Sequence, residues 1–393
     1  MRIERLEFWD KQSGWHLAPT EFDPGLTLLV GASGAGKTRI LEAIQELRSI
    51  ALWDDRTLWA KIHPGLWGLA WDATLAIEGQ RYRWEGEYEL LPPGGLPAAR
   101  ESWESANGRD DPRPRPALLK EQLRQGGTML IRRDAQAIVF QEQPTPKLAP
   151  SVSAVSLLAQ EEAIRPISSG FRRVRRLDEP LDWRVYDLGR MLPAIGRIED
   201  LKAVSIPLTD KLAVASRNFP DVFQAIIERF RAVFPFVDGL AFGERVPLGH
   251  HKEIHELQVK EKGVGVWLVA SALASGMRRT LAHLAAMALS PDDSVILIDE
   301  FENSLGVNCL DAVTDEVLSE SPRMQFLVTS HHPYILNNIP PKHWKIVSRA
   351  GSEVRTLRAE EVGIGRSRHE AFLQLVNSPA YRGEAPLEPA PAG

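Results

Sequence analysis

Hydrophobic and polar positions change their period several times along the chain, and each change predicts a new element. Residues 2–8, RIERLEF, alternate in the strand period, and residues 26–30, LTLLV, form a compact apolar run typical of a buried strand. A Gly-rich stretch follows, and over residues 38–52 the apolar positions return at helical spacing. The pattern therefore predicts a strand, a Gly-rich loop and a helix in that order.

The rest of the pattern predicts an antiparallel sheet, a mainly helical middle and a second group of strands and helices. Residues 74–90 contain two strand-like pieces, TLAIEG and RYRWEGEYEL, and strand character returns over residues 129–141. Residues 151–233 have mainly helical spacing. The later predicted strands are 236–243, 254–260, 264–269, 294–300, 325–329 and 344–349, and the later predicted helices are 276–289 and 308–319.

These elements favour an α/β protein with a mixed central sheet, an antiparallel β subdomain and a helical insertion. A chain of 393 residues with 44% hydrophobic residues is long enough for one large domain with an insertion, or for two domains. The predicted divisions are a first lobe over 1–150 with a flexible insertion at 91–116, a mainly helical lobe over 151–260, a second lobe over 261–360 and a disordered tail over 377–393.

The cysteine content and the apolar runs indicate the compartment of the protein, whereas its net charge says little about its partners. The 47 Lys and Arg residues against 52 Asp and Glu give a formal charge of −5, which supplies no overall electrostatic case for nucleic-acid binding. The single cysteine, Cys309, excludes an internal disulfide and a multi-thiolate zinc site, and it fits a reducing compartment. The longest apolar run, near residues 266–274, is too short to cross a bilayer. We therefore expect a soluble, cytoplasmic protein with no membrane partner.

The stretch GASGAGKT, residues 31–38, matches the phosphate-binding pattern G-x-x-x-x-G-K-[ST] in the strand, loop and helix context that the pattern requires. Glycines let backbone N–H groups converge on phosphates, and the following helix adds the positive end of its dipole. Lys37 would reach the β and γ phosphate oxygens, and the Thr38 hydroxyl would bind Mg²⁺. The residues predicted to bind the nucleotide here are Gly31, Ser33, Gly34, Gly36, Lys37 and Thr38.

An acidic pair follows the buried run VILI at residues 295–298. Asp299 and Glu300 would emerge at the carboxyl end of a parallel strand, where open α/β sheets bind ligands. Asp299 would hold Mg²⁺ directly or through water, and Glu300 would polarise the attacking water. The alternative is an acidic turn that caps the next helix, which the presence of the phosphate loop makes the weaker reading.

Ser275 and Gly276 begin a predicted helix, so that a hydroxyl, a bare backbone and a helix N-terminus point at one spot. This combination is typical of an anion site. Because Lys37 already serves the nucleotide of its own chain, a second copy would supply the nucleotide bound at Ser275, and a homodimer around the nucleotide is predicted. Taken alone, the motif is more often a simple helix cap.

With these motifs in this order, the sequence resembles the ABC-type ATPases, a class of P-loop NTPases whose signature reads Leu-Ser-Gly-Gly-Gln or a close variant. Residues 273–277, LASGM, match its leucine, serine and glycine and depart from it at Met277. The arginine pair at 278–279 and the segment DEFENSL make the chain most similar to the RecF-like, OLD-like and SMC-like branch, the AAA-type ATPases of DNA repair and phage defence. Residues 306–308, GVN, replace the His-Pro that often follows the acidic segment in this branch.

The resemblance implies ATP and Mg²⁺ as cofactors and ATP hydrolysis as the activity. It implies that His331, in VTSHHPYIL, is the switch histidine that senses the γ-phosphate. It also implies that Gln141, in IVFQEQP, is the loop glutamine that reaches Mg²⁺ and the attacking water, with Gln143 as the alternative. Residues 303–305, NSL, occupy the place of the dimer-contact loop.

The leading hypothesis is an ATP-driven switch, in which two chains enclose ATP, Glu300 hydrolyses it, and the opening dimer acts on a separate effector protein. DNA could be contacted through the arginines of FRRVRRLDEP, residues 171–180, although a solvated helix face is the more frequent explanation. The alternatives are an ATP-regulated subunit of a nuclease complex and a transporter ATPase. We expect no room for an OLD-type nuclease domain after His331, and the long 151–260 region disfavours a transporter subunit.

Overall fold

The computed structural model divides the chain into two compact units, one of residues 1–174 with 340–393 and one of residues 175–339. It describes all residues except 54–67, 92–114, 135–136, 147–148, 150, 178–182, 187–194, 246–253, 366–367, 379–380 and 382–393. The predicted insertion at 91–116 and the predicted tail at 377–393 lie largely outside the described residues. The predicted lobe boundaries near 150 and 260 differ from the division between these units and stay a prediction.

The first unit contains one long mixed sheet, in which the strands follow the order β3, β17, β18, β2, β1, β4, β5, β6, β7, β8, β9. β17 is parallel to β3 and β18 is parallel to β2, whereas the pairs from β2 to β9 along this order are antiparallel. The strands are β1 (Arg2–Asp10), β2 (Trp15–Glu21), β3 (Leu26–Val30), β4 (Gly68–Ile77), β5 (Gln80–Leu91), β6 (Arg115–Gln125), β7 (Thr128–Arg133), β8 (Ile138–Phe140), β9 (Gln143–Pro144), β17 (Trp344–Ala350) and β18 (Glu353–Arg358).

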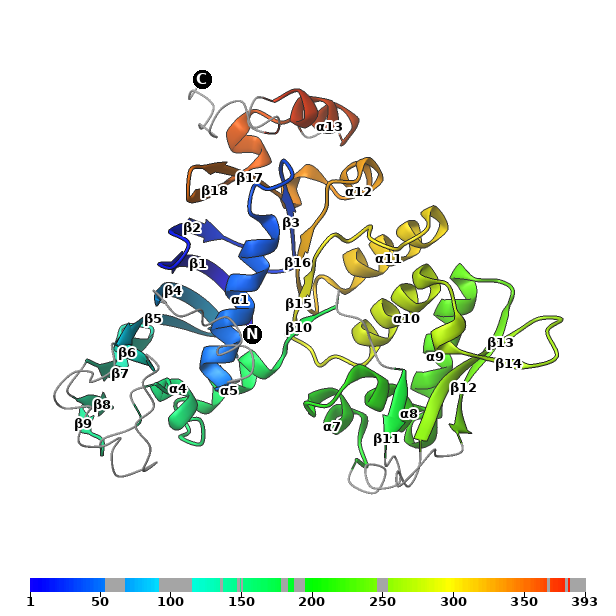
Figure 1. Ribbon diagram of the computed structural model, residues 1–393, viewed down its shortest axis with the longest axis horizontal. Coiled ribbons are helices and arrows are strands. Elements are labelled where there is room, and N and C mark those ends of the chain that lie inside the picture. The colour runs from blue at the N-terminus through cyan, green and yellow to red at the C-terminus, as the bar shows by residue number, and fades with distance from the viewer. Residues whose placement is uncertain are drawn as a thin grey trace. The chain divides into compact units, whose positions relative to one another are not determined.

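Helix α1 (Lys37–Leu52) covers this sheet and confirms the predicted strand, loop and helix (Figure 1). All five residues of β3 are buried, and α1 turns its apolar stripe inward. Helices α4 (Ala154–Leu157) and α5 (Arg165–Arg172) pack against α1, and α13 (Arg368–Asn377) closes this unit in sequence. The hydrophobic face of α1 thus fixes where the preceding loop must lie.

The second unit combines a parallel strand group with a small antiparallel sheet and a helical core. β10 (Val174–Arg176), β15 (Val295–Ile298) and β16 (Gln325–Thr329) are neighbours, with β15 and β16 parallel and entirely buried. The antiparallel sheet has the order β11, β13, β12, and β14 pairs with β13. Besides β10, β15 and β16, the elements of the second unit are β11 (Arg184–Tyr186), α7 (Ile198–Ala203), α8 (Leu208–Asn218), α9 (Pro220–Val233), β12 (Val237–Arg245), β13 (Ile254–Glu261), β14 (Trp267–Val269), α10 (Ser275–Ala288), α11 (Val307–Glu320) and α12 (Pro333–Asn338).

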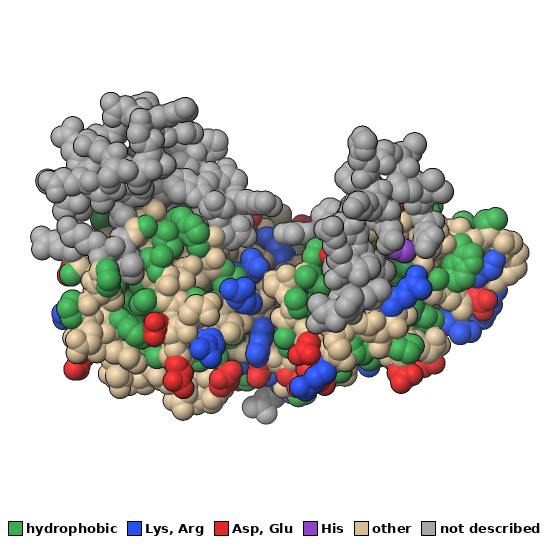
Figure 2. All heavy atoms as spheres, turned by 90° about the horizontal axis from the view of Figure 1, so that it is seen from below, with side chains coloured by type: hydrophobic (Ala, Val, Ile, Leu, Met, Phe, Trp, Pro, Cys, Tyr) green, Lys and Arg blue, Asp and Glu red, His purple; other side chains and the backbone are tan. Residues whose placement is uncertain are grey.

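The described surface carries both signs of charge. Figure 2 shows acidic and basic side chains interspersed on the face drawn there. None of the described helices is both long enough and apolar enough to cross a membrane. A functional site has to be sought in particular side-chain clusters, because the distribution of charge on this face does not point to one.

His283, on α10, makes the stability of the fold depend on pH. Its side chain is fully buried, and neither ring nitrogen has a hydrogen-bond partner among the described residues. Burial, with a smaller contribution from the positive charge of Arg279, lowers the pKa of His283 from 6.5 to about 3. Between these two values the unfolded chain binds a proton that the folded chain does not, so stability falls as the pH falls through this window.

We therefore expect wild-type protein to lose about 1.6 kcal/mol more unfolding free energy than His283→Leu when the pH is lowered from about 6.5 to about 5. Denaturant unfolding of both proteins at the two pH values measures this difference, with the titration of all other groups common to both. Parallel pH profiles for the two proteins would show that His283 is not the source of the acid sensitivity.

Candidate functional site

The phosphate loop between β3 and α1 has a backbone that requires glycine. Gly34 and Gly36 have φ values of 79° and 101°, in the left-handed region that other residues rarely adopt. A Cβ added to Gly31 would lie 2.3 Å from the carbonyl oxygen of Val347 on the neighbouring β17. Two positions need glycine for their dihedral angles and one needs it for close packing, so the loop pattern reflects backbone geometry.

The loop presents hydrogen-bond donors of the kind that a triphosphate requires. No side chain caps α1 at Gly36, and the first backbone N–H groups of a helix have no acceptor within the helix itself. The Nζ of Lys37 donates to the carbonyl oxygens of Gly31 and Ala32 at 2.8 and 2.9 Å, which holds the ammonium over the loop. Thr38 is exposed beside it. These residues fit a bound nucleotide phosphate with its Mg²⁺.

Trp15 and Arg39 adjoin the loop and were not identified from the sequence. Trp15 is 5% exposed, and its indole N–H has no hydrogen-bond partner among the described residues. A Cβ on Gly36 would lie 3.5 Å from this indole nitrogen. The Arg39 guanidinium lies over the Trp15 ring at 5.4 Å and pairs with Asp10 at 2.6 Å. An unsatisfied buried donor beside the phosphate loop is a further feature that suits an anionic ligand.

Asp299 follows β15 directly, and its carboxylate is held on both oxygens. The Thr329 hydroxyl, at the end of the neighbouring strand β16, donates to one oxygen at 2.6 Å. The guanidinium of Arg176, the last residue of β10, lies 3.4 Å from the other oxygen. Arg176 belongs to the arginine run considered for DNA contact, and the structure instead pairs it with this carboxylate. The DNA contact stays a prediction for the remaining arginines of the run.

Glu300 is exposed, and hydrogen bonds fix the backbone of Asp299 and Glu300. Its φ of 45° is unusual for a residue other than glycine, and its N–H donates to the Thr329 hydroxyl at 2.8 Å. Arg279, on α10, donates to the carbonyl oxygens of Asp299 and Glu300 at 3.1 Å each. The Glu300 carboxylate has no partner among the described residues, which leaves it available to a water molecule. Among all described residues, no three His, Cys, Asp or Glu side chains are grouped to hold a metal ion by themselves.

His331 contacts a third carboxylate of the acidic segment. Its Nδ1 lies 3.0 Å from Oε1 of Glu302, and its backbone N–H donates to the same oxygen at 3.2 Å. The imidazole is exposed, whereas the Glu302 side chain is only 10% exposed. His332 instead caps α12, because its Nδ1 accepts from the Tyr334 N–H at 3.2 Å. The structure therefore gives the two adjacent histidines different roles, and Glu302, which was not singled out from the sequence, orients the predicted switch residue.

The predicted signature serine is not a helix cap. Helix α10 begins at Ser275, its N-cap residue is Ala274, and no side chain caps it. Ser275 is exposed, so its hydroxyl is available at the helix start. A Cβ on Gly276 would lie 2.9 Å from the carbonyl oxygen of Ser304, in the predicted dimer-contact loop. The structure thus brings the signature and this loop together within one chain.

Gln141 lies apart from the phosphate loop. Strand pairing places Arg2 opposite Ala76 at one end of the sheet and Asp10 opposite Leu69 at the other end. Asp10 holds Arg39 in the first turn of α1, whereas Gln141 lines a pocket with Glu78 at the end marked by Ala76. The role of Gln141 at Mg²⁺ stays a prediction that this placement does not support. Gln143 is exposed in the short strand that follows.

A family of known proteins matches the second half of this arrangement. Residues 161–337 match the family described as "AAA domain, putative AbiEii toxin, Type IV TA system". The matched segment contains the Ser275, Asp299, Glu300 and His331 positions. Over these residues, the chain is similar to an AAA domain. No curated protein matches the chain.

Three solved structures similar to this chain are head domains of SMC proteins. An SMC head bound to the C-terminal winged-helix domain of ScpA has 16% identity and a TM-score of 0.47, covering 91% of this chain and 98% of its own. The SMC head domain from Thermotoga maritima has 13% identity and a TM-score of 0.42, covering 91% and 99%. A head domain with an extended coiled coil, bound to the C-terminal domain of ScpA derived from Pyrococcus furiosus, has 13% identity and a TM-score of 0.46, covering 91% and 96%.

Proposed function

We propose that the chain binds and hydrolyses Mg-ATP, pairs with a second copy around the nucleotide, and acts in this state as a switch for a separate effector protein. The observation that carries the proposal is the presence of two helices, α1 and α10, that begin without a capping side chain and with a hydroxyl, Thr38 or Ser275, exposed in the first turn. Each of these helix starts is suited to bind phosphate. Because a nucleotide needs only one phosphate loop, the start of α10 is available to the nucleotide bound by a second copy.

In this proposal Lys37 and the loop N–H groups bind the β and γ phosphates, while Thr38 and Asp299 hold Mg²⁺. Mg²⁺ held by these residues would supply positive charge beside the phosphates. Glu300 accepts a proton from the attacking water. Arg279 donates to the backbone carbonyl oxygens of Asp299 and Glu300, and these bonds hold the segment that carries the Glu300 carboxylate. His331, oriented by Glu302, senses whether the γ-phosphate is present.

We place this switch in the cytoplasm, in DNA repair or anti-phage defence. The description of the matching family names a putative toxin of a Type IV TA system, which favours a role in defence over one in transport. The effector is a different protein, such as a nuclease, and contact with DNA belongs to the same proposal.

Lys37→Ala tests the nucleotide site. We expect the variant to bind ATP about 10- to 100-fold more weakly than wild type, because it loses charge-assisted hydrogen bonds to the phosphates. Titration with a fluorescent ATP analogue in the presence of Mg²⁺ measures the affinity, and light scattering in the same mixtures measures dimerisation. Wild type should become dimeric with ATP, and Lys37→Ala should stay monomeric.

Lys120→Ala is the matched control, because Lys120 is an exposed lysine on β6. It removes the same charge and should bind ATP like wild type. If Lys37→Ala retained wild-type affinity, the phosphate loop would not be the nucleotide site. If wild type bound ATP but stayed monomeric, the switch would have to work without a homodimer.

A further inference from the structure

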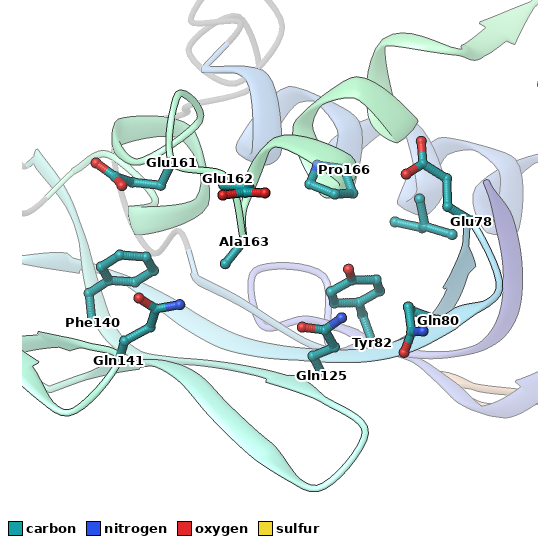
Figure 3. Close-up of a pocket in the computed structure, with 11 residues that line it drawn as sticks. Glu78, Gln80, Tyr82, Gln125, Phe140, Gln141, Glu161, Glu162, Ala163 and Pro166 are labelled. Carbon is teal, nitrogen blue, oxygen red and sulfur yellow. The ribbon is translucent and has the colours of Figure 1, made fainter.

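An acidic pocket in the first unit lies between the sheet and the segment that leads into α5 (Figure 3). Its volume is about 540 Å³. Tyr82, Gln125 and Gln141 rise from the strand side, and Glu162 and Pro166 face them from the other side (Figure 3). Strand pairing places this pocket at the end of the sheet opposite to the phosphate loop, so it is separate from the nucleotide site.

The pocket presents oxygen atoms and negative charge without any basic side chain among its described lining residues. Its polar lining consists of Glu78, Gln80, Tyr82, Gln125, Gln141, Glu161 and Glu162. None of the three carboxylates forms an ion pair within the described part of the chain. The two arginines nearest in sequence are engaged elsewhere, since Arg81 pairs with Glu4 at 2.6 Å and Arg165 donates to the Gln160 carbonyl at 3.2 Å. The negative charge of the pocket is therefore not neutralised by the described residues around it.

Tyr82 is a largely buried residue whose hydroxyl faces the pocket and has no protein partner among the described residues. The residue is 3% exposed, its hydroxyl has no hydrogen-bond partner among the described residues, and it points into the pocket (Figure 3). Burial, with a smaller contribution from the charge of Glu78, raises the pKa of Tyr82, so the group remains a neutral hydroxyl. A hydroxyl that faces the pocket, on a residue that is otherwise buried, offers a hydrogen bond to a ligand bound there.

A purely structural explanation accounts for only part of this arrangement. Glu161 and Glu162 precede α5, where negative charge is favourable beside the positive end of the helix dipole. Glu78 lies instead in the turn between β4 and β5, with a φ of 52°, and it has no helix to stabilise. The dipole of α5 explains the two glutamates before it, but it does not explain why the Tyr82 hydroxyl faces the pocket without a protein partner. Carboxylates from two separate segments line the pocket that this hydroxyl faces, which is the arrangement of a binding site.

We propose that this pocket binds an aliphatic ammonium or guanidinium group, carried either by a lysine or arginine side chain of a partner protein or by a free polyamine. Such groups carry three to five N–H donors and no acceptor, which matches a lining of carboxylates, amide oxygens and a phenol. Phosphate groups are repelled by the same lining, which excludes nucleic acid and nucleotides as ligands of this pocket. The proposal goes beyond ATP hydrolysis and does not depend on it.

Calorimetric titration of the full chain with two probes tests the proposal and distinguishes the two sources. One probe is spermidine, and the other is the peptide acetyl-Ala-Lys-Ala-Lys-Ala-amide, with the same peptide carrying Gln in place of Lys as the uncharged reference. We expect at least one cationic probe to bind at low salt, more weakly as salt is added, and the Gln peptide not to bind. Binding of the peptide alone assigns the pocket to a protein partner, and binding of spermidine assigns it to a polyamine.

Variants link this binding to the pocket. The double variant Glu161→Gln with Glu162→Gln should weaken the cationic probe by about threefold to thirtyfold, and Tyr82→Phe by about twofold to tenfold. The control is Glu199→Gln with Asp200→Asn, which removes the same charge from two exposed positions of α7 and should bind like wild type. The proposal is wrong if neither probe binds wild type, or if the pocket variants and the control bind equally well.

Discussion

Glu300→Gln is expected to slow ATP turnover by about 10² to 10⁴-fold while leaving ATP binding unchanged, the range expected for loss of a general base. The Glu300 carboxylate is exposed and has no partner among the described residues, so an amide of the same shape disturbs no neighbour. The backbone contacts from Thr329 and Arg279 do not involve the side chain and remain in the variant. Single-turnover hydrolysis and nucleotide affinity should be measured on the same preparation.

The variant should also accumulate as an ATP-bound dimer, because the dimer opens only after ATP is hydrolysed and hydrolysis is slowed. Glu228→Gln, an exposed glutamate on α9 in the same unit, is the matched control and should hydrolyse ATP like wild type. Undiminished hydrolysis in Glu300→Gln would remove this residue from the mechanism. Loss of binding together with hydrolysis would instead point to a structural role for its charge.

The phosphate loop could be predicted from sequence because its geometry depends on consecutive residues. The left-handed angles at Gly34 and Gly36, and the helix that starts at Lys37, are properties of one short segment and of the buried strand before it. Long periodic elements were confirmed for the same reason, as with α9 and α10. Three-residue strands such as β10 and β11 have too few positions to display a period, and both fell in a region predicted to be mainly helical.

The contacts that organise the acidic segment could not be predicted in this way. Arg176 and Asp299 are separated by 123 positions in the sequence, and Thr329 and Asp299 by 30. Each contact depends on which strands become neighbours, and nothing in the local sequence of Arg176 distinguishes it from the other arginines of its run. Gln141 shows the same limit. The local sequence of a polar residue after a strand does not tell which end of the sheet it will reach, and Gln141 lines a pocket at the end away from the phosphate loop.

The test with the largest consequence is complementation between Lys37→Ala and Ser275→Arg. If each nucleotide is bound by Lys37 of one chain and Ser275 of the other, both variants should be inactive alone. An equal mixture forms heterodimers that combine the intact Lys37 of one variant with the intact Ser275 of the other. Only the heterodimer has an intact site, and only one of its two sites is intact, so the mixture should reach at most about half of wild-type hydrolysis.

The value of this experiment lies in what each result says about α10. Ser275 lies at the exposed, uncapped start of that helix, and Arg279 one turn later contacts the backbone of Asp299 and Glu300 in the same chain. If the mixture regains activity, Ser275 acts on the partner's nucleotide, and α10 connects that nucleotide to the catalytic segment of its own chain. If the mixture stays inactive while Ser275→Arg alone is inactive, Ser275 serves its own chain, and a dimer is not needed for hydrolysis.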